Sequence, residues 1–330
     1  MGIYINEITI HRLLDKSNLK IQAQDDGKLL HFILTGPNGA GKTTLFNAIA
    51  KSIDEMFKDT HFNFADFKKN LGLLEGFLAK AKQEGKIEDI EQYRKQCDFF
   101  KTRCDDLWGT VELAGLNYPE IFSMVRNHKY VIAFFGAERL SHFIQVKSPV
   151  KPDLTQKELK KSKTEEFIKF LVDLKFQQSM ANNEGCKDDV ETIAKWFEGF
   201  ENILKRQIGD DALKLSFDYK NYVFYIEKTD GRFPLTDLSD GFSSALDIVA
   251  DIISKMQDGV NVVRTYDVPG MVFIDEIETH LHLKLQREIL PLLTSIFPKI
   301  QFVVTTHSPF VLSSVENAVV YDLKNQETIT

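Results

Sequence analysis

The segment at residues 36–43, GPNGAGKT, restricts the fold of this chain more than any other feature. It matches the pattern G-x-x-x-x-G-K-[ST], in which glycines let the backbone curl so that successive N–H groups face phosphate oxygens. A short apolar run at residues 31–35 precedes it, and apolar residues at helical spacing follow over residues 44–57. A strand, a glycine loop and a helix N-terminus in this order form an anion site. The alternative, a chance glycine loop, does not explain the matching flanks.

The residue types in the loop predict a nucleoside triphosphate and Mg²⁺ as ligands. Lys42 has the length to reach the β- and γ-phosphates, and the hydroxyl of Thr43 is a ligand for Mg²⁺. The loop and the first helical turn then supply the remaining contacts. The expected nucleotide-binding residues here are Gly36, Asn38, Gly39, Gly41, Lys42, Thr43 and Thr44.

Composition narrows the class of protein. The 330 residues are 43% hydrophobic and 27% charged, which is ordinary for a globular chain with a large core. A formal charge of −7 argues against binding DNA over the whole surface, although it does not exclude a local basic groove. No apolar run is long enough to span a membrane, and the N-terminus lacks a signal-peptide profile. The three cysteines form no C-x-x-C pair. We therefore expect a cytoplasmic protein with reduced thiols.

The order of expected elements predicts an α/β fold with a mixed sheet and a parallel core, because helices and apolar strands alternate toward the C-terminus. A helical lobe and a helical insertion interrupt this core. The five expected parts are a core with the phosphate loop (1–60), the insertion (61–108), core strands (109–150), the lobe (151–211) and the rest of the core (212–330).

Local patterns place the secondary structure. Residues 3–10 alternate like an exposed strand, with a hairpin partner at residues 19–23. The insertion reads as two helices joined near residues 83–85, too short for a long coiled coil. Further expected strands lie at residues 109–113 and 130–135.

The lobe is expected to be helical over residues 155–206, with a loop near residues 182–185. Its basic run at residues 157–163 predicts a solvated helix face, with nucleic-acid contact as the alternative. A hairpin at residues 213–219 and 222–227 follows it.

A second motif lies far along the chain, where an apolar strand at residues 271–274 ends in Asp275 and Glu276. Asp275 is then expected beside the threonine of the phosphate loop, where it can hold Mg²⁺. Glu276 is expected to polarise a water for attack on the γ-phosphate. The alternative is a strand end with two solvated acids, and the full phosphate loop favours the functional interpretation.

Two further pieces complete the pattern. The apolar strand at residues 301–305 leads to His307, which can bond the γ-phosphate or the attacking water. Ser239 and Gly241 begin an expected helix over residues 243–255 and form a second anion-binding helix end. The alternative there is a simple helix cap, because Ser and Asp are favoured at caps.

Together these four pieces resemble the ATP-binding cassette (ABC) ATPases, in the soluble branch of SMC-like, RecF, OLD-family and bacterial anti-phage ATPases. The resemblance covers residues 3–45 and 213–323. The stretch DEIETHLH at 275–282 is similar to the D-E-P-E-x-H-L-H of OLD-like proteins, and TTHSP at 305–309 matches their T-T-H-S-P. At a finer level the chain resembles the ATPases of Septu and retron-type defence systems.

The resemblance implies a P-loop fold of ABC type and a head-to-tail homodimer, or a higher oligomer, with two ATPs. Each ATP would lie between the phosphate loop of one subunit and Ser239 of the other. Glu276 would be the catalytic base and His307 the switch histidine. Arg12 follows the first strand, where relatives place an arginine that contacts the nucleotide, and a surface arginine is the alternative.

The chain departs from the family pattern at several positions. Asp240 and Phe242 alter the signature, and Ile277 replaces a common proline. The glutamine that contacts Mg²⁺ in relatives has two candidates, Glu138 and Gln145. A further pair, His280 and His282, is expected to be structural rather than metal-binding.

The leading hypothesis for function is an ATPase that gates a separate effector protein, with a nuclease as the expected kind, in antiviral defence. A DNA-repair or chromosome-maintenance ATPase is the first rival, and an ATP-binding scaffold with little turnover is another. The long separation of Lys42 and Asp275 argues against a membrane-transporter ATPase. Nucleic acid stays open as a partner, and no membrane is expected.

Overall fold

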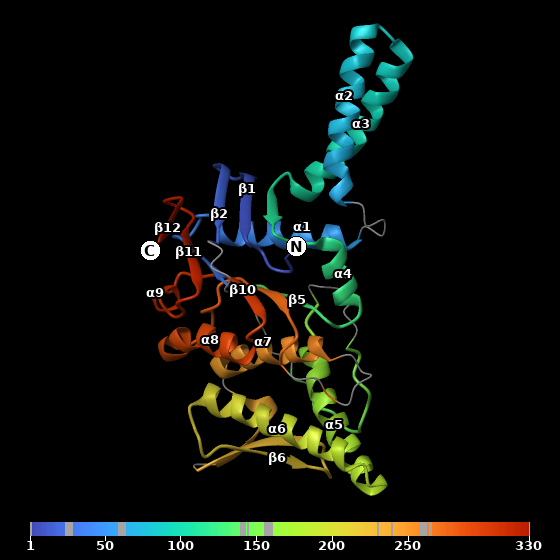
Figure 1. Cartoon of the computed structure of the whole chain (residues 1–330). Helices are drawn as coiled ribbons and strands as arrows, with labels where there is room; N and C mark the ends of the chain where they lie inside the picture. Colours follow the sequence, from blue (N-terminus) through green and yellow to red (C-terminus); the bar gives the residue numbers. More distant parts are fainter. Residues whose placement is uncertain are drawn as a thin grey trace.

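A computed structural model describes residues 2–23, 29–58, 64–138, 143, 145–154, 161–229, 231–238, 240–257, 263 and 266–329. A six-stranded sheet crosses its middle (Figure 1). Only the β12 edge is antiparallel, so the prediction of a mixed sheet with a parallel core is confirmed. In spatial order the strands are β12 (Glu327–Ile329), β11 (Ala318–Asp322), β3 (His31–Thr35), β10 (Ile300–Thr305), β9 (Gly270–Ile274) and β5 (Val131–Phe135).

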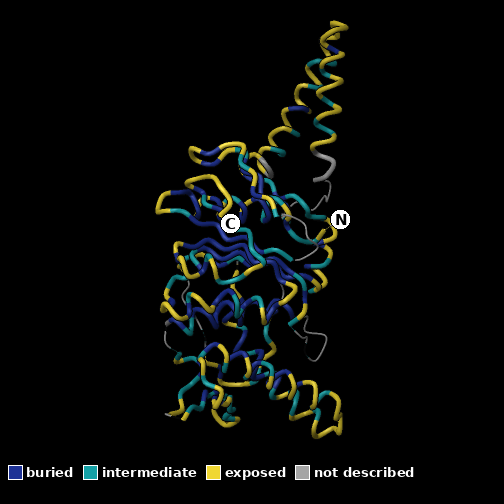
Figure 2. The backbone as a smooth tube through the Cα atoms, turned by 60° about the vertical axis from the view of Figure 1, so that its left-hand side comes forward, coloured by how far each residue is buried: buried dark blue, intermediate teal, exposed yellow. Residues whose placement is uncertain are grey.

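The central strands are buried on both faces, as Figure 2 shows. Every residue of β3, β9 and β10 is buried. Their side chains divide between two cores because successive residues of a strand point to opposite faces. Ile33 joins one core, whereas Phe32 and Leu34 join the other. Continuous apolar runs suit such strands, since parallel sheets are covered on both sides.

One face of the sheet is covered by α1 and by a small antiparallel sheet. The helix buries Leu45, Ile49 and Ile53, as its spacing predicted. The hairpin predicted near the N-terminus is also present, although its first strand begins at Glu7 rather than Ile3. The elements on this side are α1 (Lys42–Lys58), α4 (Tyr118–Arg126), β1 (Glu7–Leu13), β2 (Lys16–Gln22) and β4 (Val111–Ala114).

The other face is covered by α7 and α8, and the helical lobe and a second small sheet pack beyond these helices (Figure 1). An aromatic cluster around Trp196, Phe170 and Phe200 packs the lobe. The predicted hairpin here gains a third strand, β8, which the sequence analysis missed. The elements are α5 (Thr164–Glu184), α6 (Lys187–Ile208), β6 (Lys214–Asp218), β7 (Val223–Lys228), β8 (Gly231–Pro234), the 3-10 helix η1 (Leu235–Asp237), α7 (Asp240–Met256), α8 (Leu283–Ile296) and α9 (Pro309–Leu312).

The predicted helical insertion is a hairpin of α2 (Phe64–Glu84) and α3 (Ile87–Trp108). It projects away from the body, and most of its described residues are exposed (Figures 1 and 2). At 1.5 Å per residue, each helix is about 30 Å long. No helix in the described ranges is long and apolar enough to cross a membrane.

The prediction of a helix face at residues 157–163 is wrong where the structure describes them, although Lys161 and Ser162 are exposed as expected. Residues 155–160 lie outside the described residues, and α5 begins only at Thr164. Lys163 is 8% exposed, and its backbone N–H donates to Asp251 of α7. Asp251 also forms a buried ion pair with Lys255 at 2.6 Å. The end of this basic run therefore anchors the lobe to α7.

His31 joins the two strands next to the phosphate loop. Its Nδ1 accepts a hydrogen bond from the backbone N–H of Phe302 in β10 at 3.1 Å. The residue is 2% exposed. Burial lowers the pKa of His31 from 6.5 to about 4, because the charged imidazole is poorly solvated there.

This pKa predicts acid sensitivity of the fold. Between pH 6.5 and about 4 the unfolded chain binds a proton at His31 that the native chain does not, so the free energy of unfolding falls as the pH falls. The loss approaches about 3 kcal/mol. His31→Asn keeps an acceptor but cannot titrate, and should lose less stability than wild type in urea unfolding between about pH 7 and about pH 5. Equal losses in the two proteins would contradict this assignment.

Candidate functional site

The phosphate loop connects β3 to α1 with a backbone that only glycine adopts easily. Gly36, Gly39 and Gly41 have φ values of +139°, +81° and +94°. A Cβ atom on Gly39 would meet nothing within 4 Å, so this part of the loop is open to a ligand. The first N–H groups of α1, at Lys42, Thr43 and Thr44, have no partner inside the helix. These features suit an anion at the helix N-terminus.

Lys42 is the cation at this helix end. Its residue is 4% exposed, and its Nζ donates to the carbonyl oxygens of Gly36 at 2.9 Å and Pro37 at 3.3 Å. Burial lowers the pKa of Lys42, whereas the surrounding carboxylates, of which Glu276 acts most strongly, raise it. A lysine surrounded by acceptors and carboxylates is positioned for charge compensation of phosphates.

Thr305 connects the two acidic residues at the end of β9. Its hydroxyl donates to Oδ1 of Asp275 at 2.5 Å and accepts the backbone N–H of Glu276 at 2.8 Å. Asp275 is 1% exposed, so this partner keeps one carboxylate oxygen in a fixed direction. The sequence analysis placed Thr305 in a motif but gave it no role.

The backbone of Glu276 has an unusual conformation. Its φ is +46°, in the left-handed region that costs a residue other than glycine about 1 kcal/mol. The hydrogen bond from Glu276 N–H to Thr305 holds this turn, and the hydroxyl of Thr279 donates to Oε2 of Glu276 at 3.4 Å. Strained turns of this kind concentrate at functional sites, where they direct a side chain away from the strand.

His307 lies between the loop lysine and the acidic pair. Its Nδ1 is 3.4 Å from Nζ of Lys42, and its Nε2 is 3.8 Å from Oε1 of Glu276. An ammonium only donates, so Nδ1 accepts and the proton of a neutral imidazole is on Nε2, toward the carboxylate. The structure thus brings Lys42, Glu276 and His307 together from three segments far apart in the sequence.

Glu278 fixes the segment that carries His307. Its Oε2 accepts the hydroxyl of Thr306 at 2.7 Å, and its Oε1 accepts the backbone N–H of His307. The backbone N–H of Thr306 also donates to Leu34 of β3 at 3.0 Å. Sequence reasoning missed Glu278 as a positioning residue, although its place in the DEIE stretch was a usable signal.

Three other residues that we expected in the site are not among the contacts described so far. Ser239 lies outside the described residues. Gly241 is in the first turn of α7, where a Cβ atom would be 3.1 Å from the carbonyl oxygen of His280, so close packing accounts for this glycine. Arg12 is exposed on β1, two residues before Leu14. A Cβ atom on Gly41 would lie 3.1 Å from Leu14, which brings the β1–β2 turn beside the loop.

The structure gives no evidence of a functional role for the remaining candidate residues. Glu138 and Gln145 are both exposed on the segment after β5. His280 has a φ of +66° in the turn that packs on α7. Within the described ranges no three His, Cys, Asp or Glu side chains gather as a metal site, and the structural role expected for His280 and His282 stays a prediction.

The donors at this site suit Mg²⁺ and a triphosphate. Asp275 and Thr43 offer a carboxylate and a hydroxyl, the hard oxygen ligands that Mg²⁺ prefers. These two oxygens would hold the ion, which would neutralise phosphate charge when bound. The open side of Gly39 and the free helix end leave room for phosphate oxygens beside Lys42.

The chain is similar to several known proteins. The family described as "AAA domain, putative AbiEii toxin, Type IV TA system" matches residues 128–313. Septu protein PtuA of Bacillus mycoides is 27% identical over 98% of this chain, and PtuA of Bacillus thuringiensis is 26% identical over 94%. Retron Ec83 probable ATPase of Escherichia coli is 38% identical over 30% of this chain. The predicted resemblance to Septu and retron ATPases is therefore confirmed.

The chain is shorter than these relatives. It spans 41% of the B. mycoides protein, 74% of the B. thuringiensis protein and 19% of the retron ATPase. Among solved structures, the SMC head domain from Thermotoga maritima is similar with a TM-score of 0.43 and 12% identity, over 98% of this chain and 94% of that one. An SmcHead bound to the C-winged helix domain of ScpA gives a TM-score of 0.42 and 14% identity, over 98% and 96%.

The loop lysine provides the first test of the site. Lys42→Ala removes the ammonium that faces the loop carbonyls and His307, and should weaken ATP binding by about tenfold or more, since charge-assisted contacts to phosphate are strong. Isothermal titration calorimetry with ATP and Mg²⁺ measures the loss. Lys51→Ala, on the same helix, is a matched control that should bind normally. Wild-type affinity in Lys42→Ala would contradict the phosphate-loop assignment.

Proposed function

The chain belongs to the AAA-domain family that matches its residues 128–313, and from this premise we propose that it is an ABC-type ATPase that hydrolyses ATP. One observation carries the proposal. His307 lies 3.4 Å from the ammonium of Lys42 and 3.8 Å from the carboxylate of Glu276, at the ends of neighbouring strands. A cation for the phosphates and a group that deprotonates or orients the attacking water recur in phosphoryl transfer, and here an imidazole lies beside both.

In the proposed reaction each side chain has a separate task. Lys42 and the N–H groups of the loop hold the phosphates, and Mg²⁺ held by Thr43 and Asp275 would offset their charge. Glu276 accepts a proton from the attacking water. The proton on Nε2 of His307 points toward Glu276, where it can orient that water or bond the γ-phosphate. Thr305 and Glu278 keep the base and the imidazole in place.

Replacement of the base separates binding from hydrolysis. Glu276→Gln keeps the shape of the side chain but cannot accept the proton, so ATP binding should stay near wild type while turnover falls at least about a hundredfold. Phosphate release and calorimetry measure the two quantities. Glu327→Gln, which replaces an exposed carboxylate on β12, is the control and should turn over normally. Undiminished phosphate release in Glu276→Gln would show that another group is the base.

We propose that two subunits bind head to tail, with Ser239 of each completing the ATP site of the other. The first turn of α7 supports this proposal, because it begins immediately after Ser239 in the sequence and its first N–H groups have no partner within the helix itself. Gly241 allows the turn at His280 to approach this helix end closely. A helix N-terminus suits the γ-phosphate of a neighbouring nucleotide.

We further propose that the dimer acts in the cytoplasm and gates a separate effector, with a nuclease as the expected kind, in antiviral defence. Similarity to Septu and retron ATPases supports this role. Two states of the dimer, with ATP and with ADP, offer a partner different surfaces, and a partner that prefers one state shifts the equilibrium. The projecting hairpin of α2 and α3 and the lobe of α5 and α6 are the proposed docking surfaces (Figure 1).

Ser239→Arg tests both steps. The bulky side chain should block pairing and turnover while ATP binding to the loop persists. A mixture with Lys42→Ala should recover turnover, because a mixed dimer collects both defects in one site and keeps the other intact. In pull-downs from native cells, wild type with ATP should recover a partner that Ser239→Arg does not. Normal turnover of Ser239→Arg alone would exclude the shared site, and equal recovery of the partner would exclude gating by the dimer.

A further inference from the structure

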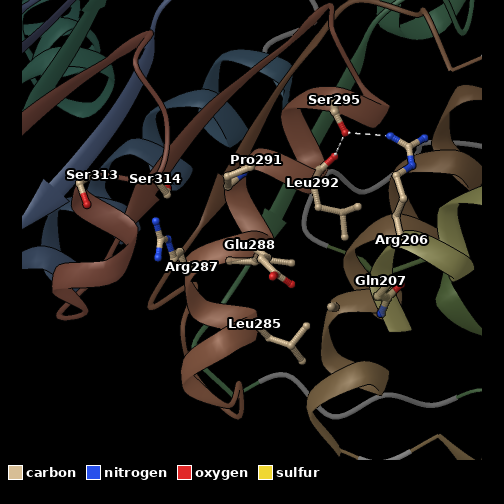
Figure 3. A pocket seen from close by; sticks show the side chains of 12 residues that line it. Arg206, Gln207, Leu285, Arg287, Glu288, Pro291, Leu292, Ser295, Ser313 and Ser314 are labelled. Atoms are coloured by element: carbon tan, nitrogen blue, oxygen red, sulfur yellow. Dashed lines mark hydrogen bonds between the residues drawn. The ribbon is translucent and has the colours of Figure 1, made fainter. Parts of the chain in front are cut away.

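A second cavity lies away from the phosphate loop. It has a volume of about 540 Å³ and is enclosed by α6, the first half of α7, α8 and the segment after α9 (Figure 3). None of its lining residues belongs to β3, the phosphate loop or α1. The volume is in the range of sites for small organic ligands. Its walls combine apolar side chains with charged and amide groups, which is the composition of a specific site rather than a packing gap.

Gln207 contributes a buried acceptor without a partner. The residue is 3% exposed and lines the cavity. Its Nε2 donates to the carbonyl oxygen of Phe242 at 2.7 Å. Because that carbonyl can only accept, the amide cannot be turned around, and Oε1 is the atom left over. Oε1 has no hydrogen-bond partner within the part of the chain that the structure describes. A buried acceptor of this kind is completed by a donor such as a water or a group of a bound ligand.

Charged groups occupy other parts of the cavity wall. Arg287, Ser313 and Ser314 lie together on one side, whereas Arg206 and Gln207 lie on the other (Figure 3). Arg206 donates to Ser295 at 3.2 Å, so part of its hydrogen-bonding capacity is used. Arg287 has no ion-pair partner in the described ranges, and it is exposed to a ligand. The hydroxyl of Ser314 donates to the carbonyl oxygen of Val311 at 2.8 Å, so the donors for a phosphate or carboxylate on this side are the Arg287 guanidinium and the Ser313 hydroxyl.

Apolar and acidic groups lie between these two ends. Leu285 and Leu292 project into the space, and Glu288 lies between them and Arg287 (Figure 3). When ionised, Glu288 can only accept hydrogen bonds and repels an anion, so it favours a ligand with N–H or O–H donors at this point. The complementary ligand has an anionic end, a flat apolar body and several donors at its other end.

We propose that this cavity binds a nucleoside monophosphate. The phosphate would pair with Arg287 and the hydroxyl of Ser313, and the base would lie against Leu285 and Leu292. An N–H of the base would donate to Oε1 of Gln207. Guanine offers both a ring N–H and an amino group as donors, so GMP should bind more tightly than AMP. Binding at this site does not depend on the proposed ATPase activity.

The position of the cavity also couples it to the ATP site, and this part of the inference rests on the proposed function. Gln207 holds Phe242 in the first turn of α7, three residues after Ser239 in the sequence. On α8, Gln286 accepts a hydrogen bond from the hydroxyl of Ser308 at 2.8 Å, and Ser308 follows His307. A ligand that contacts Gln207 and Arg287 together therefore connects the helix end proposed for the partner's nucleotide to the switch histidine.

Calorimetry on the Lys42→Ala chain tests binding with the phosphate loop disabled. GMP should bind saturably, and ribose 5-phosphate and guanosine should each bind at least about tenfold more weakly, because each lacks one end of the ligand. Arg287→Ala in the same background should weaken GMP binding by about tenfold or more. Arg94→Ala on α3, far from the cavity, is the matched control and should bind like its parent. Far-ultraviolet circular dichroism verifies that each variant is folded.

Three results would overturn the site. The first is that neither GMP nor AMP binds saturably to Lys42→Ala. The second is that Arg287→Ala leaves GMP binding unchanged. The third is that ribose 5-phosphate binds with the same affinity as GMP. The coupling has its own test in the otherwise native chain, where GMP should change ATP turnover, and Arg287→Ala should abolish that change. Constant turnover at saturating GMP would overturn the coupling. Normal turnover in Glu276→Gln would contradict only the assigned base, so the two proposals fail separately.

Discussion

The hydroxyl of Thr305 is the contact on which the candidate site depends. Thr305 is the last residue of β10. This strand lies between β3, which the phosphate loop follows, and β9, which Asp275 and Glu276 follow. By donating to Asp275 and accepting from the N–H of Glu276, one side chain fixes two carboxylates of different function. Neither a serine with a mobile rotamer nor a valine without the hydroxyl would do this equally well, since a threonine is stiff at χ1.

Electrostatics explains why the neighbouring strand ends are held so tightly. One ammonium, that of Lys42, lies among the carboxylates of Asp275, Glu276 and Glu278, and burial makes its charge costly. Glu278 is kept in place by the segment it positions, through Thr306 and the backbone N–H of His307. Charge and hydrogen bonds thus support one another. A phosphate bound among these side chains would face fixed dipoles instead of water. This is the arrangement that stabilises transition states.

Much of the local structure could be predicted from the sequence. The glycine loop, the amphipathic pattern of α1 and the apolar runs of β9 and β10 each follow from residue types at short range. Helices α2 and α3 could be predicted from the sequence equally well, because the turn between them at Gly85 interrupts a helical pattern. The errors arose where long-range contacts determine the local structure. Lys163 is buried against α7, where Asp251, 88 residues away, accepts its backbone N–H. The strand β8 forms because it pairs with the edge of β7.

By itself the sequence determined which chemical groups are present and at which strand and helix ends they occur, since a motif such as GPNGAGKT encodes its own backbone. The tertiary structure alone decided their relations. Only the strand order β3-β10-β9 brings His307 between Lys42 and Glu276. Only the packing of α6 on α7 leaves Oε1 of Gln207 without a partner among the described residues. The reason is physical: hydrogen bonds to strand ends and buried amides connect residues hundreds of positions apart, and no short-range pattern records which of them will meet.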